Sequence, residues 1–514
     1  MLRVGIVGAG FGGVLTAIRI HKDCNIPLSE ITLFDSQADV GGVWQANTYP
    51  GAAVDIPSPL YSASFEPNPD WSHLYSPQAE LQDYVKTVAT KYNVYDRVEF
   101  KTLVTEARWS EDSKTWHVTT VPAAAADTAS SDANVQPTTY EFEIFISAVG
   151  TLRRPKVPEM FNAFTGTKFH SSRWDHSVDI SDKHVAVVGC GASAAQVIPA
   201  IVDNCAKLTV FQRTPSHCIP RGSYEFSSLT KSIFRYVPLV QRLYRASLFF
   251  YMEMLWFGMK PGSFVSWFVT RLSRKHLENQ IVDPELRDKL QPKHTAGCKR
   301  ILITDDYYPA LVRPNVTVHN GPIDKVTASE LIVTSEGESV AHKPDVLVLA
   351  TGFQTMDFLA PLKVIGRNDK SISAALSSDE CGEEGINTYK GILVADAPNF
   401  FISYGPGTNL GHNSIIFMLE CQATFMVNTI KELQRKQAQV TDGGKVTVEA
   451  KPSAIKSWSD KNQKGFEGTT WAAGCSNWYR SPKTGRIDTL YSGNCTSYWF
   501  ETRNLDKNDL IFLM

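Results

Sequence analysis

The chain has 514 residues, 43% of them hydrophobic and 20% charged, with a formal net charge of -2. This length is too great for one ordinary core and predicts two or three domains, while the composition is that of a globular protein. A balance of charge so close to neutral gives no reason to expect nucleic acid or an anionic membrane as the main partner.

The cysteines indicate a reducing environment. They are odd in number, scattered, and contain no C-x-x-C pair, which predicts reduced thiols, no zinc site and no redox dithiol. The N-terminal apolar stretch is broken by glycines and is expected to be a strand, not a signal peptide, so the expected location is cytoplasmic. The nine cysteines are Cys24, Cys190, Cys205, Cys218, Cys298, Cys381, Cys421, Cys475 and Cys495.

The first strand is expected at Val4–Val7, directly before Gly8-Ala9-Gly10-Phe11-Gly12-Gly13. This run matches G-x-G-x-x-G, in which glycines allow a tight turn and a close approach of backbone to a pyrophosphate. The following helix, expected at about residues 12–22, points its free N–H groups at phosphate. The next strand ends in Asp35, whose carboxylate can accept hydrogen bonds from both hydroxyls of an unphosphorylated ribose. The first unit therefore predicts FAD or NAD.

Glycine-rich turns follow this unit. Gly41-Gly42-Val43-Trp44, Tyr49-Pro50-Gly51 and Asp55-Ile56-Pro57-Ser58 resemble the GGxW, YPG and D-I-P-S motifs of the Baeyer–Villiger branch of the flavin-containing monooxygenase superfamily. The resemblance implies that the glycines and the Pro-Gly turn lay backbone against a flat flavin, with Asp55 held near it in a loop before a proline. An Asp that only shapes a turn is the alternative.

Ser76-Pro77 predicts the start of a helix that ends near Tyr92, because a cap residue precedes proline at the first helical position. Residues 98–110, 115–121 and 140–149 alternate like antiparallel strands. Residues 122–139 are rich in Ala, Ser, Thr and Asp and are expected to form a solvated loop without function. The following residues, 148–158, resemble the superfamily's crossover out of the FAD domain.

The crossover leads to Phe164-x-Gly166-x-x-x-His170-x-x-x-Trp174-Asp175. This segment resembles the Baeyer–Villiger fingerprint at every fixed position. A His and a Trp four residues apart are more often packed in a core than functional. Their place in the link between two nucleotide domains nevertheless favours a role in domain movement while NADP⁺ stays bound.

A second dinucleotide fingerprint follows the apolar run Val185–Val188, where Gly189-Cys190-Gly191-Ala192-Ser193-Ala194 fits G-x-G-x-x-G/A. The next strand, Leu208–Phe211, runs into Gln212-Arg213-Thr214, so that a guanidinium and a hydroxyl replace the acid and match a 2′-phosphate. A lone Arg is usually a solvated surface residue, but this position favours NADPH. A bound FAD together with NADPH indicates a redox enzyme.

Residues 224–292 interrupt the second unit with a helical pattern. Within them, Ala246–Met259 is markedly apolar, but it contains Glu253 and is short for a membrane span. A buried helix is the first interpretation. The alternatives are an interfacial patch and the wall of an access path for an apolar substrate.

Gly297-Cys298-Lys299-Arg300 is similar to the superfamily's G-x-K-R segment. Neighbours in an extended chain point to opposite faces, so Lys299 can meet the 2′-phosphate of NADPH while Arg300 turns towards the flavin. A solvated pair of cations is the default alternative. Residues 345–353 match D-x-x-x-x-A-T-G-F, which closes the FAD domain in the superfamily.

Residues 404–414 precede an apolar helix expected from Ile415 to about Arg435, whose N-terminus would offer N–H groups to the pyrimidine edge of reduced flavin. His412 is expected to be a loop histidine, not a base. The tail, residues 470–479, resembles a segment near the nicotinamide, although residues 491–493 read Tyr-Ser-Gly where W-P-G is usual.

The resemblance implies an α/β fold with two Rossmann-like dinucleotide-binding domains, for FAD and NADP, and a helical insertion in the NADP domain. The expected boundaries are 1–153 with 345–514 for the FAD domain, 154–222 with 297–344 for the NADP domain and 223–296 for the insertion. It also implies that NADPH reduces FAD, and that a C4a-peroxyflavin formed with O₂ inserts one oxygen atom next to a ketone carbonyl to give an ester or lactone. Arg300, oriented by Asp55, would keep the peroxide anionic, the form that attacks a carbonyl.

Three other functions compete with this one. An N- or S-oxygenating flavin-containing monooxygenase has the same fold but is disfavoured by Trp174-Asp175 and Arg300. A disulfide oxidoreductase is disfavoured by the lack of a paired cysteine motif. An inactive redox sensor is disfavoured by the many polar residues suited to chemistry.

The candidate residues form four sets, with no metal ligands among them, and the expected partners are a ketone and O₂, without nucleic acid or a transmembrane span. The catalytic pair is Arg300 and Asp55, and the fingerprint set is Phe164, Gly166, His170, Trp174 and Asp175. The residues expected at FAD are Gly8, Gly10, Gly13, Asp35, Gly42, Val43, Trp44, Asp55, Tyr61, Val104, Ser414 and Ile415. Those expected at NADP are Gly189, Gly191, Ala192, Ser193, Ala194, Gln196, Arg213, Thr214 and Lys299.

Overall fold

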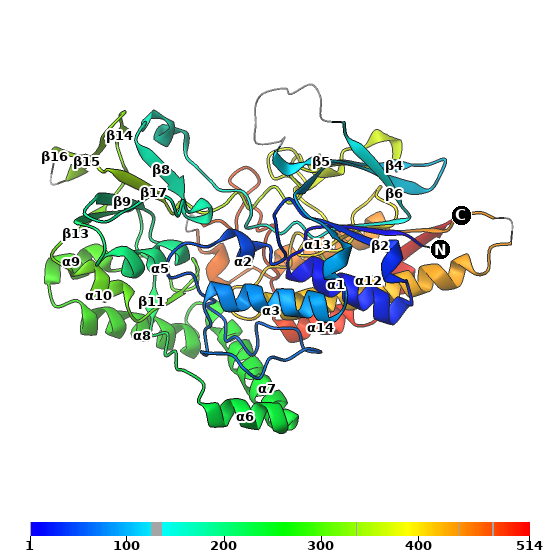
Figure 1. Cartoon of the computed structure of the whole chain (residues 1–514), viewed down its shortest axis with the longest axis horizontal. Coiled ribbons are helices and arrows are strands. Elements are labelled where there is room, and N and C mark those ends of the chain that lie inside the picture. The colour runs from blue at the N-terminus through cyan, green and yellow to red at the C-terminus, as the bar shows by residue number, and fades with distance from the viewer. Residues whose placement is uncertain (1, 125–135, 336, 442, 475–476) are drawn as a thin grey trace.

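A computed structural model describes residues 2–124, 136–335, 337–441, 443–474 and 477–514. Two five-stranded sheets, one in each lobe, organise the chain (Figure 1). The first has the strand order β19-β7-β1-β2-β3 and the second the order β13-β10-β9-β17-β8. Helices pack against both sheets, so the predicted α/β class with two dinucleotide-binding units is confirmed. Most of the predicted loop at residues 122–139 lies outside the described residues.

The first sheet is built around β1 (Val4–Val7), which pairs in parallel with β2 (Ile31–Phe34) and β7 (Ile144–Ser147). Nearly every residue of these strands is buried, as expected for strands covered on both faces. α1 (Phe11–Cys24) and α12 (Ile415–Gln437) lie side by side against this sheet (Figure 1). Both helices were predicted, and both begin directly after a glycine-rich or polar turn.

The segment 140–149 does not form one strand, and that prediction is wrong. The half-exposed β6 (Thr138–Phe142) pairs with β5 (Thr115–Pro122), which pairs with β4 (Thr102–Ser110) in an antiparallel sheet. Residues 144–147 instead enter the first sheet as the wholly buried β7. The predicted strand 98–110 is divided in the same way, since β3 (Val98–Glu99) belongs to the first sheet.

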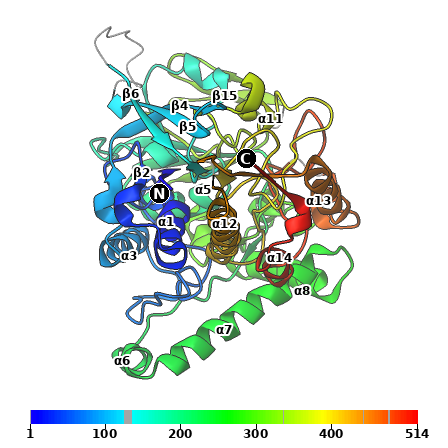
Figure 2. The same cartoon turned by 90° about the vertical axis from the view of Figure 1, so that its right-hand side faces the viewer.

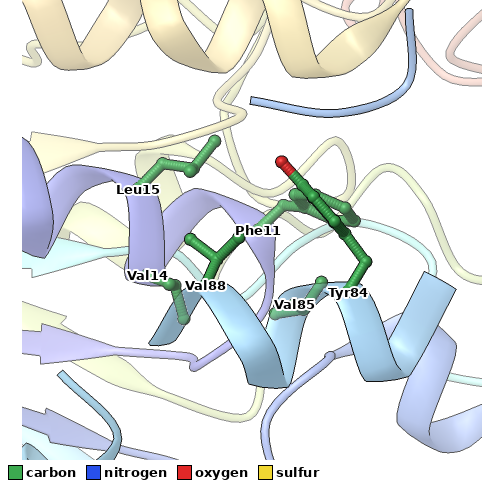
Figure 3. Close-up of a pocket in the computed structure, with 6 residues that line it drawn as sticks. All are labelled: Phe11, Val14, Leu15, Tyr84, Val85 and Val88. Carbon is green, nitrogen blue, oxygen red and sulfur yellow. The ribbon is translucent and has the colours of Figure 1, made fainter. Parts of the chain in front are cut away.

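The helix predicted after Ser76 is α3 (Gln78–Lys91), whose N-cap is Pro77, without a side-chain cap. It packs beside α1, and the side chains between the two helices leave a small apolar pocket (Figure 3). The only polar atom that these side chains contribute, the hydroxyl of Tyr84, donates to the carbonyl of Glu66 at 2.6 Å and is therefore satisfied. The pocket lies in the packing behind the first fingerprint and is lined by Phe11, Val14, Leu15, Tyr84, Val85 and Val88.

The second sheet repeats the first arrangement. β9 (His184–Val188) pairs in parallel with β10 (Lys207–Gln212), and α5 (Ala192–Ile201) connects them. The expectation that residues 345–353 close the first domain is wrong, because β17 (Val346–Leu349) pairs with β9 and with β8 (Thr167–His170). The boundary expected at 344/345 therefore falls too early, and the chain completes the second sheet before it returns to the first lobe.

Shorter elements complete the two lobes. Those of the second lobe are β11 (Cys218–Ile219), β12 (Leu302–Ile303), α10 (Tyr307–Leu311), β13 (Val316–Asn320), β14 (Lys325–Val326), β15 (Leu331–Ser335) and β16 (Glu338–His342). The others are α2 (Val43–Ala46), β18 (Lys363–Ile365), α11 (Ile372–Ala375), β19 (Phe400–Ile402), β20 (Thr447–Ala450), α13 (Pro452–Lys464), α14 (Cys495–Thr502) and β21 (Leu510–Leu513).

The predicted helical insertion comprises α6 (Ser228–Tyr236), α7 (Pro238–Leu255), α8 (Phe264–Gln280) and α9 (Pro284–Leu290). α6 and α7 project from the lower edge of the molecule (Figures 1 and 2). The first interpretation of residues 246–259 as a buried helix is wrong, since Phe250, Tyr251, Met254 and Phe257 are exposed.

Within the described ranges, no helix combines the length and the apolar character needed to cross a membrane.

The prediction of reduced thiols holds for seven cysteines of the described segments, which are free. It is wrong for Cys298, which is disulfide-bonded. Cys475 lies outside the described residues. The disulfide at Cys298 ties down the chain directly before Lys299 and Arg300, which a count of scattered cysteines could not reveal.

Candidate functional site

One ion pair joins the two lobes at the centre of the predicted site. Asp55 lies between α2 and α3 of the first lobe, and Arg300 precedes β12 of the second. The guanidinium of Arg300 donates from Nε to Asp55 Oδ2 at 2.7 Å, and its Nη2 lies 2.5 Å from the same oxygen. Both side chains are about two-thirds covered, at 28% and 33% exposed. The two residues predicted to be catalytic are therefore brought into direct contact.

Tyrosines surround this pair and make the site apolar. The negative charge of Asp55 raises the pKa of Arg300, against the opposing effect of burial. Burial raises the pKa of both Tyr61 and Tyr479 to about 12, while the charge of Arg300 acts in the other direction. Burial also raises the pKa of Tyr404, and the charge of Arg300 again opposes the change; the backbone of Tyr404 has a φ of 63°. Arg300 is therefore a permanent cation among neutral phenols, and sequence analysis missed Tyr404 and Tyr479.

The glycines of the first unit fall into two kinds. A Cβ on Gly8 would lie 2.3 Å from the carbonyl oxygen of Ala148, and one on Gly13 only 1.9 Å from that of Gly8. These two glycines are required by the fold itself. Gly10 and Gly42 instead face each other, with a Cβ on Gly42 only 3.0 Å from Gly10 Cα, and each begins a helix that no side chain caps. This paired, uncapped backbone fits a pyrophosphate.

Asp35 is buried at the end of β2, where it was predicted. Its carboxylate accepts hydrogen bonds from the backbone N–H of Ala9 at 2.7 Å and of Gln37 at 2.9 Å. Burial raises the pKa of this carboxyl group, and the two hydrogen bonds oppose the change. Since each oxygen retains a lone pair, the fixed carboxylate can still accept from ribose hydroxyls.

The remaining residues of the FAD set line the same end of the first sheet or pack behind it. The ring of Trp44 meets that of Tyr61 edge to face at 5.7 Å. Val43 opens α2 directly before Trp44. Val104 is 2% exposed in an apolar cluster, so its side chain is committed to packing. Ser414, the buried N-cap of α12, donates to the carbonyl of Leu60 at 3.2 Å and leaves the N–H groups from Ile415 onward without a side-chain cap.

The second unit presents the same kind of turn. Gly189 has a φ of 127°, and a Cβ there would lie 2.3 Å from the carbonyl oxygen of Ala350. A Cβ on Gly191, by contrast, would meet nothing within 4 Å. Gly191 is the N-cap of α5, has no side chain to cap it, and is followed by the first turn Ala192-Ser193-Ala194. Gly191 therefore leaves open space beside a free helix N-terminus.

Two cations lie near this turn. Burial lowers the pKa of Lys299, and the positive charge of Arg213 lowers it further. The loop that carries Arg213 and Thr214 is fixed to the turn after β9, because Cys190 Sγ donates to the carbonyl of Thr214 at 3.0 Å. Two cations from distant segments, one of which lowers the pKa of the other, form a site for an anion such as a 2′-phosphate.

Gln196 lies at the contact between the lobes. Its side chain accepts from Tyr49 Oη at 2.8 Å and donates to the carbonyl of Ala53 at 2.9 Å. A Cβ on Gly51 would approach the Gln196 carbonyl to 2.5 Å. The Pro-Gly turn predicted to lie against a flavin thus packs on α5. Gln196, in the same helix as the second fingerprint, binds that turn to the second lobe.

The 164–175 fingerprint is a packed segment. Phe164 is 1% exposed, and the absence of a side chain on Gly166 leaves room for its ring. His170 is buried, with burial lowering its pKa, and its ring meets Phe353 edge to face at 5.5 Å. Trp174 packs on Phe169 at 5.0 Å, and the exposed Asp175 accepts from Ser177. The fingerprint contains β8, which pairs with β17, and His170 contacts Phe353 in the segment that follows β17.

A buried polar cluster was missed by sequence analysis. Glu253, on the inner face of α7, accepts hydrogen bonds from Asn413 Nδ2, the N–H of Cys495, and the N–H and hydroxyl of Thr496, at 2.8–3.1 Å. His412 Nε2 lies 3.5 Å from the carboxylate. Glu253, His412 and Cys495 could hold a metal ion by proximity, but four donors already occupy the carboxylate. A charge in an apolar helix was the only sequence signal.

The segment before Arg300 is fastened to the C-terminal tail. Asn477 Nδ2 donates to the carbonyl of Cys298 at 3.1 Å. A Cβ on Gly297 would lie 3.1 Å from Thr470 Oγ1. The tail predicted to lie near a nicotinamide therefore contacts the cation-bearing segment, and it brings Tyr479 to Arg300.

The sequence matches the family model for flavin-binding monooxygenase-like proteins over residues 1–371. It is 32% identical to a Baeyer–Villiger monooxygenase of Streptomyces coelicolor over 98% of this chain and 91% of that protein, and 33% identical to one of Pseudomonas aeruginosa over 98% and 90%. The fold is similar to a closed crystal structure of cyclohexanone monooxygenase, with a TM-score of 0.83, 24% identity and coverage of 100% of this chain and 99% of that chain. An oxidized steroid monooxygenase bound to NADP matches with a TM-score of 0.80, 24% identity and the same coverage.

We predict that Glu253→Gln destabilises the protein in a pH-dependent way. Burial alone would raise the pKa of Glu253, but its hydrogen-bond partners and the nearby His412 lower it to about 2. The stabilisation is complete above the pKa of the unfolded chain, about 4.3, and is lost as pH falls through the folded value. Glu253→Gln should lower the free energy of unfolding at pH 7 by roughly 3 kcal/mol.

Denaturant unfolding between pH 7 and pH 2 measures this effect, and the difference between the two proteins should shrink only below about pH 4. Glu278→Gln, which removes an exposed carboxylate paired with Arg274 on α8, serves as the control and should change little. Equal effects of the two substitutions at pH 7 would show that the buried cluster does not stabilise the fold.

Proposed function

The chain belongs to the family of flavin-binding monooxygenase-like proteins that includes the Baeyer–Villiger monooxygenases, and from this premise we propose that Arg300 and Asp55 direct its chemistry. The protein uses FAD, NADPH and O₂ to insert one oxygen atom next to a ketone carbonyl, which gives an ester or a lactone. The observation that carries the proposed roles is the Arg300–Asp55 pair, which places a fixed cation between the two nucleotide units.

The first lobe would hold FAD. The backbone of Gly10 and Gly42 would meet the pyrophosphate, Asp35 the ribose, and the N-terminus of α12 the flavin ring, where its free N–H groups favour negative charge. Once reduced by NADPH, FAD supplies the activation of O₂. The described residues of the protein provide position, charge and the exclusion of water.

The second lobe would hold NADPH. The open turn at Gly191 would accept the pyrophosphate, and Arg213 together with Lys299 would bind the 2′-phosphate. The preference for NADPH over NADH follows from these two cations, since the residue after β10 is not an acid. The fingerprint segment around His170 would guide the movement between the lobes, because it packs against the returning strand.

Arg300 would stabilise negative charge on oxygen. A guanidinium stays protonated throughout, and here buried tyrosines lie around it and the side chain is about two-thirds covered, so its field is stronger than in solvent. Asp55 positions the guanidinium through Nε and Nη2. A deprotonated oxygen nucleophile attacks a carbonyl, whereas a protonated one oxidises soft N or S atoms, and Arg300 favours the first outcome.

We also propose a cytoplasmic location and an apolar ketone as substrate. Seven cysteines of the described segments are free, which suits a reducing compartment, while Cys298 is disulfide-bonded. The wall of apolar side chains on α7 remains a hypothesis for the access path. Truncating its aromatic residues should then weaken the binding of long-chain ketones.

We predict that Arg300→Ala retains FAD but loses ester formation by about 10²–10³-fold, the usual loss when one preorganised donor is removed. The measurement is product formation across cyclic, aryl and long-chain ketones, together with FAD absorbance. Arg313→Ala, which removes an exposed arginine paired only with Asp203, is the matched control and should keep full activity. Full ester formation by Arg300→Ala would remove the assignment, and oxidation of sulfides in place of ketones by the unmodified enzyme would favour the N- or S-oxygenating class.

We expect Lys299→Ala to raise the KM for NADPH by about 10–100-fold, the value of a charge-assisted hydrogen bond to phosphate. The KM for NADH should stay the same, because NADH lacks the 2′-phosphate. Steady-state kinetics with both coenzymes gives the ratio. Lys293→Ala, six residues earlier and exposed, controls for loss of a nearby charge. An equal rise for NADH and NADPH would show that Lys299 does not contact the phosphate.

Two glycines of the second fingerprint should separate folding from binding. Gly189→Ala should destabilise the protein by about 1–3 kcal/mol, because φ is positive and the carbonyl of Ala350 blocks the new Cβ. Gly191→Ala should leave the melting temperature unchanged, since its Cβ meets nothing, but should raise the KM for NADPH by about tenfold by blocking the pyrophosphate. Thermal unfolding and NADPH kinetics test both variants, and an unchanged KM for Gly191→Ala would contradict the assignment.

A further inference from the structure

The buried face of α7 carries polar side chains beside the apolar ones, such as Met252, that pack on the core. Gln241 donates to the carbonyl of Asn68 at 2.8 Å. Arg245 donates to the hydroxyl and the carbonyl of Ser62, both at 2.8 Å. Glu253 binds the buried cluster described above. Each of these three side chains forms hydrogen bonds with groups inside the protein. Together the bonds fix the orientation of the helix around its own axis.

The face of α7 turned away from the protein is apolar. Leu239, Leu243, Phe250 and Met254 are 57–67% exposed. Their spacings of four, seven and four residues place them on one side of the helix. A helix that rests on a protein in water normally turns polar side chains outward. The outward face of α7 is therefore suited to an apolar environment.

The neighbouring helices extend this surface. Leu229 and Tyr236 of α6, and Phe264 and Trp267 of α8, are 55–77% exposed. α6 and α7 form the lower edge of the molecule in both views (Figures 1 and 2), and α8 follows α7 in the chain. We call this surface the insertion patch. It comprises Leu229, Tyr236, Leu239, Leu243, Phe250, Met254, Phe264 and Trp267. Large apolar side chains exposed on successive helices in this way mark sites of interaction.

The cations of the insertion decide which partner fits. Lys260 lies over the ring of Trp256, and Arg271 over that of Trp267. Arg242 is exposed on α7, one residue from Leu243. The acidic residue of α8, Glu278, is neutralised by Arg274 at 2.8 Å. A second copy of the chain would bring these cations against each other, whereas anionic lipid headgroups would neutralise them beside an apolar layer.

We propose that the insertion patch docks on the surface of a bilayer that contains anionic phospholipid, with α7 lying in the plane of the interface. Aromatic and aliphatic side chains enter the boundary between headgroups and acyl chains, and the cations meet phosphate. The net charge of -2 is no obstacle, because the patch is locally basic. Glu253 connects the docked helix to Asn413 at the start of α12, so the helix stays fixed to the first lobe.

Flotation of the full-length, FAD-loaded protein with lipid vesicles tests the proposal. One set of vesicles is phosphatidylcholine alone, and the other is an equal mixture of phosphatidylcholine and phosphatidylserine. The double variant Leu243→Glu with Phe250→Glu places charge on the patch. Met160→Glu, at a partly exposed methionine of the 159–163 turn in the second lobe, is the matched control. FAD content and NADPH oxidation show that each variant is folded.

The unmodified protein should bind the mixed vesicles about tenfold more strongly than phosphatidylcholine alone, and less strongly as salt is added. The double variant should lose this binding by about tenfold or more, while Met160→Glu keeps it. Absence of binding to the mixed vesicles would overturn the proposal. So would binding that survives the double substitution, or a dimer in sedimentation velocity that the double substitution dissociates while vesicles remain unbound.

Discussion

The contact between Arg300 and Asp55 is the interaction on which the rest of the structure depends. It joins two lobes that each carry a nucleotide fold, and it fixes a cation that is about two-thirds covered and lies among buried phenol rings. Removing a charge from water costs free energy unless the charge is paired. Here Oδ2 of Asp55 pairs with both Nε and Nη2 of Arg300. The disulfide at Cys298 and the hydrogen bond from Asn477 hold the adjoining chain, so the position of Arg300 is determined from several sides.

The two lobes use the same solution for binding anions and differ at one point. Helices that begin at Gly10 and Gly191 have no side-chain cap, so their first N–H groups are left for a ligand. Helices elsewhere, such as α8 and α14, are capped by Ser263 and Asn494. The difference lies at the end of the second strand of each unit. The first lobe has the buried carboxylate of Asp35 there, and the second has Arg213, whose positive charge acts on Lys299.

Much of this could be predicted because it rests on local sequence. The two glycine fingerprints, Asp35, Arg213 and the G-x-K-R segment each combine a turn with the residue type that its chemistry needs. Strand partners could not be predicted in this way. Residues 346–349 and 144–147 are both short apolar runs, and only the tertiary pairing decides which sheet receives each.

The other failures share a physical cause, namely partners that are distant in sequence. The carboxylate of Glu253 is stabilised by groups more than 150 residues away in sequence. The sequence of its helix alone therefore could not show that this charge is buried while apolar residues of the same helix are exposed. Cys298 is bonded although no cysteine motif precedes it. Tyr404 and Tyr479 reach Arg300 from separate loops, and the resemblance of those loops to cofactor segments did not identify these two side chains as its neighbours.

A crystal structure of the complex with FAD and NADP⁺ tests the central claim most directly, through the distance from the guanidinium of Arg300 to the isoalloxazine ring. The account predicts a separation of about 4 Å, close enough for a strong electrostatic effect, with the contact to Asp55 kept. A guanidinium more than about 10 Å from the ring, beyond a Debye length at ordinary ionic strength, would contradict it.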